Sequence, residues 1–188
     1  MVDTSGSMKS PVTGNRGSVT TKTSCVDVAA LIASAILRKN PDAEVIPFDT
    51  RVHDHRLNPM DSVVTNAKTL AKFGGGGTNC SAALEYVNKN NGKGDLVIYV
   101  SDNESWVDSG RSRSTAMMTE WNKFKARNPG AKLVCIDITP NGTTQAHDRE
   151  DILNVGGFSD SVFEVIARFV ELGNNKDLWI KTIESVTL

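Results

Sequence analysis

The chain has 188 residues, of which 39% are hydrophobic and 23% charged, and its formal net charge is −1. This composition is typical of one globular domain with a sizeable core. The near-neutral charge argues against a domain that binds nucleic acid by electrostatics alone, because phosphate binding needs clustered lysine and arginine. No apolar run approaches the roughly 18 residues that span a bilayer, and no charged and then apolar leader opens the chain. We therefore expect a soluble, cytoplasmic protein.

The cysteines Cys25, Cys80 and Cys135 are widely spaced and include no CxxC pair, which argues against a structural zinc site. Cys25 falls on a helical face and Cys135 in an apolar run, so we expect both to be small core residues. A reducing compartment fits this cysteine usage better than an oxidising one.

In chain order, residues 9–18 are polar and glycine-rich, which indicates a surface loop or hairpin. Apolar residues then recur with helical spacing over 20–39. Residues 43–48 form a short apolar run that predicts a buried strand. Residues 51–57 could pair beside that strand after a tight turn.

The second part of the chain alternates in the same way. Residues 60–73 have helical spacing, four glycines follow at 74–77, and Thr78 and its neighbours open another helix. The run at 95–100 predicts a buried strand. The later segments are a helix at 112–127, a strand at 132–138, a loop at 140–150, a short strand at 152–155, an amphipathic helix at 161–172 and a final strand or docked tail at 174–188.

The predicted strands are continuous apolar runs, as expected for parallel strands that helices cover on both faces. We therefore predict an α/β fold with an open, mostly parallel, doubly wound sheet of Rossmann-like type. A single domain over residues 1–188 is expected.

Oxygen-bearing side chains follow several of these strands. Asp3, Ser5 and Ser7 alternate in the loop at the start of the chain, Thr78 follows the four glycines, and Asp102 follows the strand at 95–100. Ligands of an open parallel sheet bind beyond the carboxyl ends of its strands, so these three segments should converge on one edge. Carboxylate and hydroxyl oxygens are ligands that Mg²⁺ or Mn²⁺ accepts.

Asp-x-Ser-x-Ser at 3–7, a glycine-rich loop with Thr78 and the later Asp102 together resemble the metal-ion-dependent adhesion site (MIDAS) of von Willebrand factor A domains. The resemblance implies that Asp3, Ser5, Ser7, Thr78 and Asp102 hold one Mg²⁺ or Mn²⁺. It also implies a partner protein that completes the metal shell with a carboxylate.

Four further segments are similar to the A domain of the Ro RNA-binding (TROVE) family, including its bacterial orthologues. They are Gly-Gly-Thr-Asn-Cys-Ser at 76–81, Ser-Asp-Asn-Glu-Ser-Trp at 101–106, Thr-Pro-Asn-Gly-Thr-Thr at 139–144 and Asp-Ile-Leu-Asn-Val-Gly-Gly-Phe at 151–158. In that family a ring of helical repeats precedes the A domain and binds misfolded RNAs and small Y RNAs. This chain carries no such ring, so the resemblance implies the metal-bearing portion of a larger ribonucleoprotein component, or a stand-alone relative.

Simpler interpretations compete with several of these assignments. The 3–7 loop could be a helix cap or a turn. No Gly-Lys-Ser/Thr follows the glycines at 74–77, so they are expected to place Thr78 rather than to bind nucleotide phosphate. His53 and His55 lie two apart on one predicted strand face and are expected to be surface residues. The remaining charged set should be a solvated helix face rather than an RNA contact: Arg111, Arg113, Lys123, Lys125 and Arg127.

Only Met1 and Val2 precede the 3–7 loop, whereas a central strand has about five or six residues. We expect that the chain lacks most of its first central strand and an upstream RNA-binding domain.

These inferences combine into one functional prediction, a divalent-cation-dependent protein-interaction domain of a Ro-type protein in RNA quality control. Asn103 and Glu104 are candidate partner contacts. The alternatives are a metal-independent scaffold with a vestigial site, and a metal-dependent phosphohydrolase with Glu104 as its base. No nucleophile motif of a hydrolase is found, so we expect binding rather than catalysis.

Overall fold

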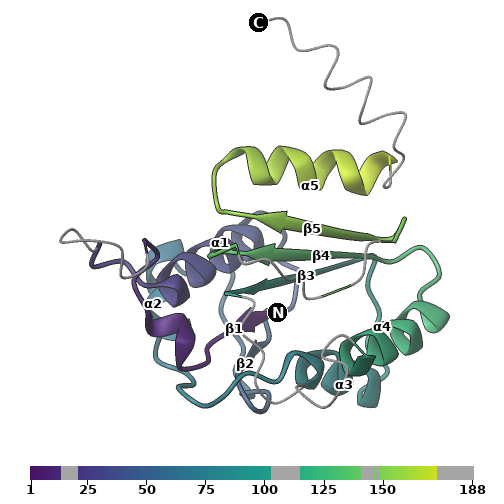
Figure 1. The fold of residues 1–188 in the computed structure, drawn as a ribbon, viewed down its shortest axis with the longest axis horizontal. Helices are drawn as coiled ribbons and strands as arrows, with labels where there is room; N and C mark the ends of the chain where they lie inside the picture. The colour runs from purple at the N-terminus through teal and green to yellow at the C-terminus, as the bar shows by residue number, and fades with distance from the viewer. Residues whose placement is uncertain (14–20, 103–114, 141–145, 147–148, 173–188) are drawn as a thin grey trace, which may run out of the picture.

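The computed structural model of the chain describes residues 1–13, 21–102, 115–140, 146 and 149–172. Its centre is a five-stranded sheet in which all neighbouring strands are parallel, in the order β2-β1-β3-β4-β5 (Figure 1). The strands are β1 (Val2–Asp3), β2 (Pro47–Phe48), β3 (Leu96–Ser101), β4 (Lys132–Asp137) and β5 (Ile152–Gly156). The predicted α/β fold with a parallel, doubly wound sheet is confirmed.

Helices cover both faces of this sheet. Buried side chains of α1, α2 and α5 form one hydrophobic cluster with the strands, and those of α3 and α4 form another. In Figure 1, α3 and α4 lie together and apart from α1 and α2. The helices are η1, a 3-10 turn (Ser7–Lys9), α1 (Cys25–Lys39), α2 (Val63–Leu70), α3 (Cys80–Lys89), α4 (Thr115–Arg127) and α5 (Ser161–Leu172).

The start of α1 shows how local chemistry sets a boundary. Ser24 accepts a hydrogen bond from the Asp27 backbone N–H, and the Asp27 side chain accepts one from the Ser24 backbone N–H. This reciprocal capping satisfies two of the N–H groups that a helix start leaves open. The helix therefore begins at Cys25 rather than near residue 20, where the periodicity placed it.

The strand prediction at 43–48 was too long, because β2 comprises Pro47–Phe48 alone. The prediction that 51–57 pairs beside it was wrong beyond one antiparallel bridge between Phe48 and Val52. The short length of β2 has a physical cause, since its neighbour β1 offers only Val2–Asp3 for pairing.

All three cysteines are buried, as expected for Cys25 and Cys135. Burial raises the pKa of the Cys135 thiol, and the nearby Cys80 adds to this effect, so Cys135 behaves as an apolar core residue. Among the described residues, no helix has both the length and the apolar character that a bilayer crossing needs.

Candidate functional site

Asp3 ends the strand β1, which lies between β2 and β3, and its side chain is 0% exposed. Two groups donate hydrogen bonds to its carboxylate: the Ser5 backbone N–H to Oδ1 at 2.8 Å, and the Ser101 hydroxyl to Oδ2 at 2.6 Å. The carboxylate is therefore held in one orientation by its own loop and by the neighbouring strand β3. Ser101 was not anticipated from the sequence.

The two serines of the same loop lie next to each other. Ser5 is buried and Ser7 is half-buried at the start of η1, and their hydroxyl oxygens are 3.1 Å apart. The 3-10 turn is closed by hydrogen bonds from the Lys9 N–H to the Gly6 carbonyl and from the Ser10 N–H to the Ser7 carbonyl. Asp3, Ser5 and Ser7 thus form one compact group of oxygen atoms.

The glycine loop at 74–77 is joined to this group through its backbone. The Gly75 N–H donates to the Thr4 carbonyl at 2.9 Å, and the Gly6 N–H donates to the Gly76 carbonyl at 2.8 Å. Gly74 has a φ of +78°, and a Cβ there would lie 1.9 Å from the Thr4 carbonyl oxygen. Only glycine permits this close approach of the two loops. The loop leads directly to Thr78, which is fully buried, so the expected placing role is supported over a phosphate cradle.

Asp49 is a further buried carboxylate at this edge, and sequence reasoning gave it no role. It follows β2 and accepts hydrogen bonds from the backbone N–H groups of Gly76 and Arg51, at 3.2 Å each. Its Oδ1 also lies 3.1 Å from Nε2 of His53. Burial alone raises the pKa of Asp49, but these backbone donors, His53 and Thr50 outweigh it, so the pKa lies below its usual value. Asp49 therefore anchors the glycine loop as a carboxylate.

Asp102 follows β3 and is 4% exposed. Because Val2 pairs with Val100, the chain beyond β3 leaves the sheet beside the loop that follows β1. The charge of Asp102 acts on Asp3 and contributes to raising its pKa. The predicted ligand segments thus meet at the carboxyl edge of the sheet, and metal binding by Asp3, Ser5, Ser7, Thr78 and Asp102 stays a prediction.

The electrostatics of Asp3 provide a test of whether the site suits a cation. Burial, with a smaller contribution from Asp102, raises the pKa of Asp3 from 3.8 to about 6, although Ser101 and Ser5 act in the opposite direction. Within the described part of the chain, no lysine, arginine or histidine lies within ion-pair distance of Asp3. A buried carboxylate of this kind, next to neutral hydroxyls and a second carboxylate, fits a divalent cation.

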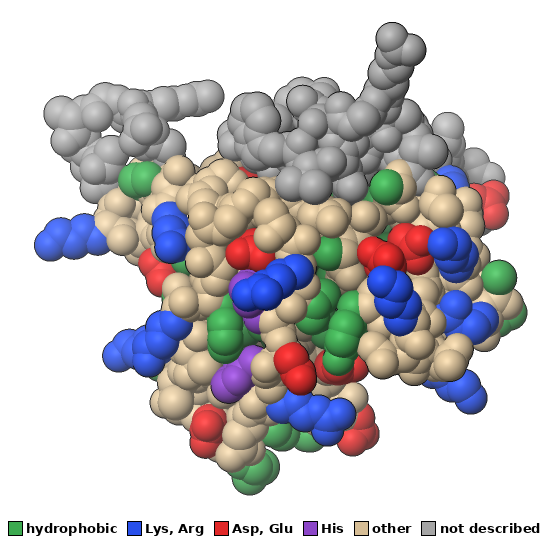
Figure 2. All heavy atoms as spheres, turned by 90° about the horizontal axis from the view of Figure 1, so that it is seen from below, with side chains coloured by type: hydrophobic (Ala, Val, Ile, Leu, Met, Phe, Trp, Pro, Cys, Tyr) green, Lys and Arg blue, Asp and Glu red, His purple; other side chains and the backbone are tan. Residues whose placement is uncertain are grey.

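Two further predictions concern the surroundings of this edge. Asn103 and Glu104, the candidate partner contacts, lie outside the described residues. His53 and His55 are half-buried rather than surface residues of a strand, because both rings pack against Phe73, with centroid distances of 5.6 and 5.0 Å. Figure 2 shows histidine side chains beside hydrophobic ones on the face seen there.

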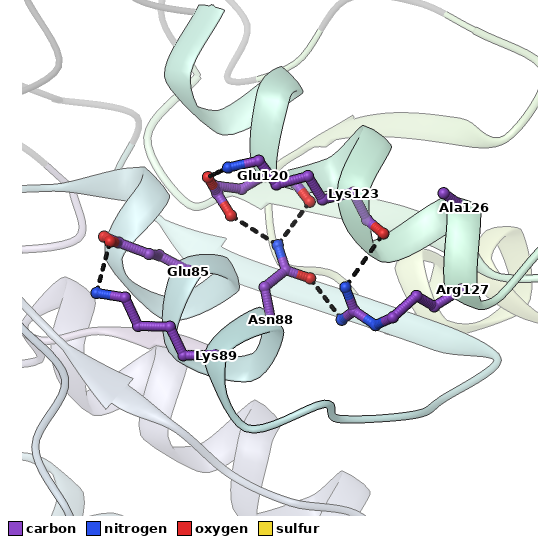
Figure 3. A pocket seen from close by; sticks show the side chains of 7 residues that line it. All are labelled: Glu85, Asn88, Lys89, Glu120, Lys123, Ala126 and Arg127. Carbon is purple, nitrogen blue, oxygen red and sulfur yellow. Dashed lines mark hydrogen bonds and ion pairs between the residues drawn. The ribbon is translucent and has the colours of Figure 1, made fainter.

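The described members of the basic cluster, Lys123, Lys125 and Arg127, make their contacts elsewhere. Lys123 and Arg127 line a hollow of about 500 Å³ between α3 and α4, where Lys123 pairs with Glu120 and Arg127 with the Asn88 side chain (Figure 3). Lys125 instead contacts the Ala131 carbonyl. These interactions agree with the expected solvated helix face. Arg111 and Arg113 lie outside the described residues.

Comparison with known proteins agrees with this architecture. The structure of the Ro (RSR) protein of Deinococcus radiodurans is similar at 22% identity with a TM-score of 0.69, over 90% of this chain and 33% of that protein. An aerotolerance-related membrane protein of Bacteroides fragilis, with multiple mutations to serines, is similar at 16% identity with a TM-score of 0.54, over 90% of this chain and 96% of that one. At these identities, both likenesses show the fold.

The family comparison is more specific than these structural likenesses. The Ro60 vWA (von Willebrand factor A) domain family matches residues 1–170, which include β1 and all but the last two residues of α5. The chain therefore belongs to the Ro60 vWA domain family.

Proposed function

We propose that this chain is a divalent-cation-dependent protein-interaction domain, which binds an acidic group of a partner protein through Mg²⁺ or Mn²⁺. The observation that carries the proposal is the buried Asp3 carboxylate, which has no cationic side chain within ion-pair distance among the described residues. Asp3, Ser5, Ser7, Thr78 and Asp102 are the proposed ligands.

The composition of the ligand set favours binding over catalysis. Three of the five proposed ligands are hydroxyls, so only Asp3 and Asp102 offset the charge of the cation. Mg²⁺ takes about six oxygen ligands and keeps water readily. When bound, the cation supplies an electrophilic centre with an exchangeable position, which a carboxylate of the partner can fill. The hydrogen bonds from Ser5 and Ser101 fix the orientation of the Asp3 carboxylate before the metal binds. This pre-organisation lowers the conformational entropy lost on metal binding.

Membership of the Ro60 vWA domain family supports a proposal for the setting of the domain. The chain spans about a third of the Deinococcus Ro protein that it resembles. We propose that a parent protein of Ro type binds misfolded or small Y-like RNAs through another domain, in cytoplasmic RNA quality control, while this chain recruits a protein. RNA binding by this chain alone should be weak. A sub-micromolar affinity in a filter-binding assay at physiological salt would contradict that expectation.

Calorimetric titration with Mg²⁺ and Mn²⁺ tests the proposal directly. Wild type should give a binding isotherm, and Asp3→Ala should abolish it, since one of the two charged ligands is lost. Asp61→Ala is the matched control, because Asp61 is an exposed aspartate in the turn that precedes α2. Identical isotherms for wild type and Asp3→Ala would exclude this metal site.

Two other results would replace the proposal by one of its alternatives. Partner binding that persists in a chelator would indicate a scaffold with a vestigial site. Turnover of phosphoesters that requires Mg²⁺ or Mn²⁺, and that is lost in Asp3→Ala, would indicate a phosphohydrolase.

A further inference from the structure

Lys9 is an exposed lysine whose side chain lies at the rim of the candidate metal site. It ends the turn η1, which begins at the proposed ligand Ser7, so its backbone belongs to the metal loop. Its side chain crosses to the other loop: a Cβ built on Gly75 would lie 3.0 Å from the Lys9 Nζ and 3.7 Å from its Cε. The Lys9 side chain therefore extends from the loop that carries Ser5 and Ser7 to the glycine loop that leads to Thr78.

The surface under Lys9 is bare backbone. Gly74, Gly75 and Gly76 are all exposed, and the backbone hydrogen bonds of Gly75 and Gly76 hold this strip against the metal loop. Glycine is used where another chain or a ligand approaches a backbone closely. The Lys9 ammonium thus lies over a side-chain-free strip of the glycine loop, which is hydrogen-bonded to the metal loop.

The charges around Lys9 indicate that its ammonium is available to attract an anion. Within the described residues, no carboxylate lies within ion-pair distance of Lys9. A divalent cation balances the charges of Asp3 and Asp102, and the Asp49 carboxylate is engaged by His53 and by the N–H groups of Gly76 and Arg51. Among the described residues, Lys9 is thus a cationic side chain that no carboxylate of this edge pairs with. A cation site without a bound partner gains nothing from a nearby ammonium, because like charges repel. An incoming anion is attracted by both the metal cation and the Lys9 ammonium.

We propose that Lys9 contacts the partner: its ammonium donates a hydrogen bond to one oxygen of a partner carboxylate, while the other oxygen of that carboxylate binds the metal. This inference rests on the proposed function and names the residue that selects an acidic side chain there. The ammonium donates a charge-assisted hydrogen bond to the carboxylate, which is stronger than a bond between neutral groups. Lys9 adds specificity for the partner and contributes nothing to holding the cation.

The experiment uses the full chain saturated with Mg²⁺ and acetate as the probe for a protein carboxylate. Binding is followed by the NMR shifts of the Gly75 and Gly76 amides. Lys9→Met removes the charge and keeps the length of the side chain. It should weaken acetate binding about threefold to fivefold, the upper range for an exposed ion pair. Lys39→Met removes an exposed lysine at the last residue of α1 and should leave acetate binding unchanged.

The Mg²⁺ affinity, measured in the same variants without acetate, separates this inference from the proposed function. Absence of Mg²⁺ binding by wild type would refute the proposed function itself. Normal Mg²⁺ binding by Lys9→Met together with unchanged acetate affinity would overturn the role of Lys9 alone. A loss of Mg²⁺ affinity in Lys9→Met would also overturn it, because Lys9 would then support the loops.

Dimethyl phosphate, a monoanion that represents the RNA backbone, is the competing probe. Tighter binding of dimethyl phosphate than of acetate, with loss in Lys9→Met, would overturn the assignment to a protein carboxylate. Acetate binding that exceeds dimethyl phosphate binding supports it.

Discussion

Replacing Asp3 by asparagine should stabilise the metal-free protein, although it removes a proposed metal ligand. The pKa of Asp3 rises from 3.8 to about 6 on folding, mainly because the carboxyl group is buried. Folding therefore favours the protonated form, and the folded state loses stability as the pH rises from about 4 to about 6. Above that window the ionised carboxylate destabilises the fold by about 3 kcal/mol. Asparagine avoids this cost, since it carries no charge at any pH.

Thermal unfolding in a chelator at two pH values measures the effect. At pH 7.5, about 3 kcal/mol corresponds to a rise in Tm of about 6–12 °C for a chain of this size. At pH 4.5, the wild-type side chain is largely protonated in the fold, and the advantage of asparagine should shrink to about 1 kcal/mol. With Mg²⁺ at pH 7.5, wild type should gain stability from metal binding and Asp3→Asn should gain none.

Asp49→Asn is the matched comparison, because Asp49 is a second buried aspartate at the same edge with 6% exposure. Its pKa lies below the usual value, since backbone donors and His53 outweigh the effect of burial. The same substitution should therefore lower the stability at pH 7.5, by about 1–3 kcal/mol for the lost charged acceptor. A lower Tm for Asp3→Asn in chelator, or an equal gain at both pH values, would refute the electrostatic reasoning.

Three further predictions concern the pH dependence of metal binding, the glycine loop and the hydrogen bonds of Asp151. Mg²⁺ affinity should fall about tenfold for each pH unit below 6, because the cation competes with the proton on Asp3. Calorimetric titration at pH 5 and at pH 7 measures the two affinities, and equal values would contradict this prediction. Gly74→Ala should lower stability by about 3 kcal/mol or more, because its Cβ meets the Thr4 carbonyl, whereas Gly130→Ala, with nothing within 4 Å, should be neutral in the same unfolding assay. Asp151 accepts hydrogen bonds from the N–H of the buried Trp121 and from the guanidinium of Arg149. Asp151→Ala should lower the free energy of unfolding by about 2–4 kcal/mol, because it leaves both donors without this acceptor. Its Mg²⁺ affinity should be unchanged, because these contacts lie outside the candidate metal site.

The elements that the sequence predicted well are those with strong local patterns. The apolar runs of β3 and β4 are six residues each, and the helical period of α5 matches its observed bounds. The prediction for the β2 region failed because the length of β2 depends on its pairing with β1, which is distant in the sequence and therefore not a local property. Capping at Ser24 and Asp27 could have been read from the sequence as a helix start, since both residue types favour that position.

The candidate site also contains residues that local sequence patterns predict and residues whose role depends on distant contacts. Asp3, Ser5 and Ser7 form one short pattern, and Asp102 follows an evident strand, so the position of all four at this edge of the sheet could be predicted. The anchoring of the glycine loop by Asp49 could not, because it depends on an N–H group 27 residues away. The only local signal was an aspartate directly after the apolar run at 43–48, the same position relative to a strand that Asp102 occupies.

The hydrogen bonds that assemble this edge join residues far apart in the chain: Asp3 and Ser101 are 98 positions apart, and Thr4 and Phe48 are 44 apart. Contacts of such separation form late in folding, because the intervening chain must close before they contribute. A cation that binds only the finished edge is absent from the folding transition state. We therefore expect Mg²⁺ to leave the folding rate unchanged and to slow unfolding, so that it prolongs the lifetime of the native domain.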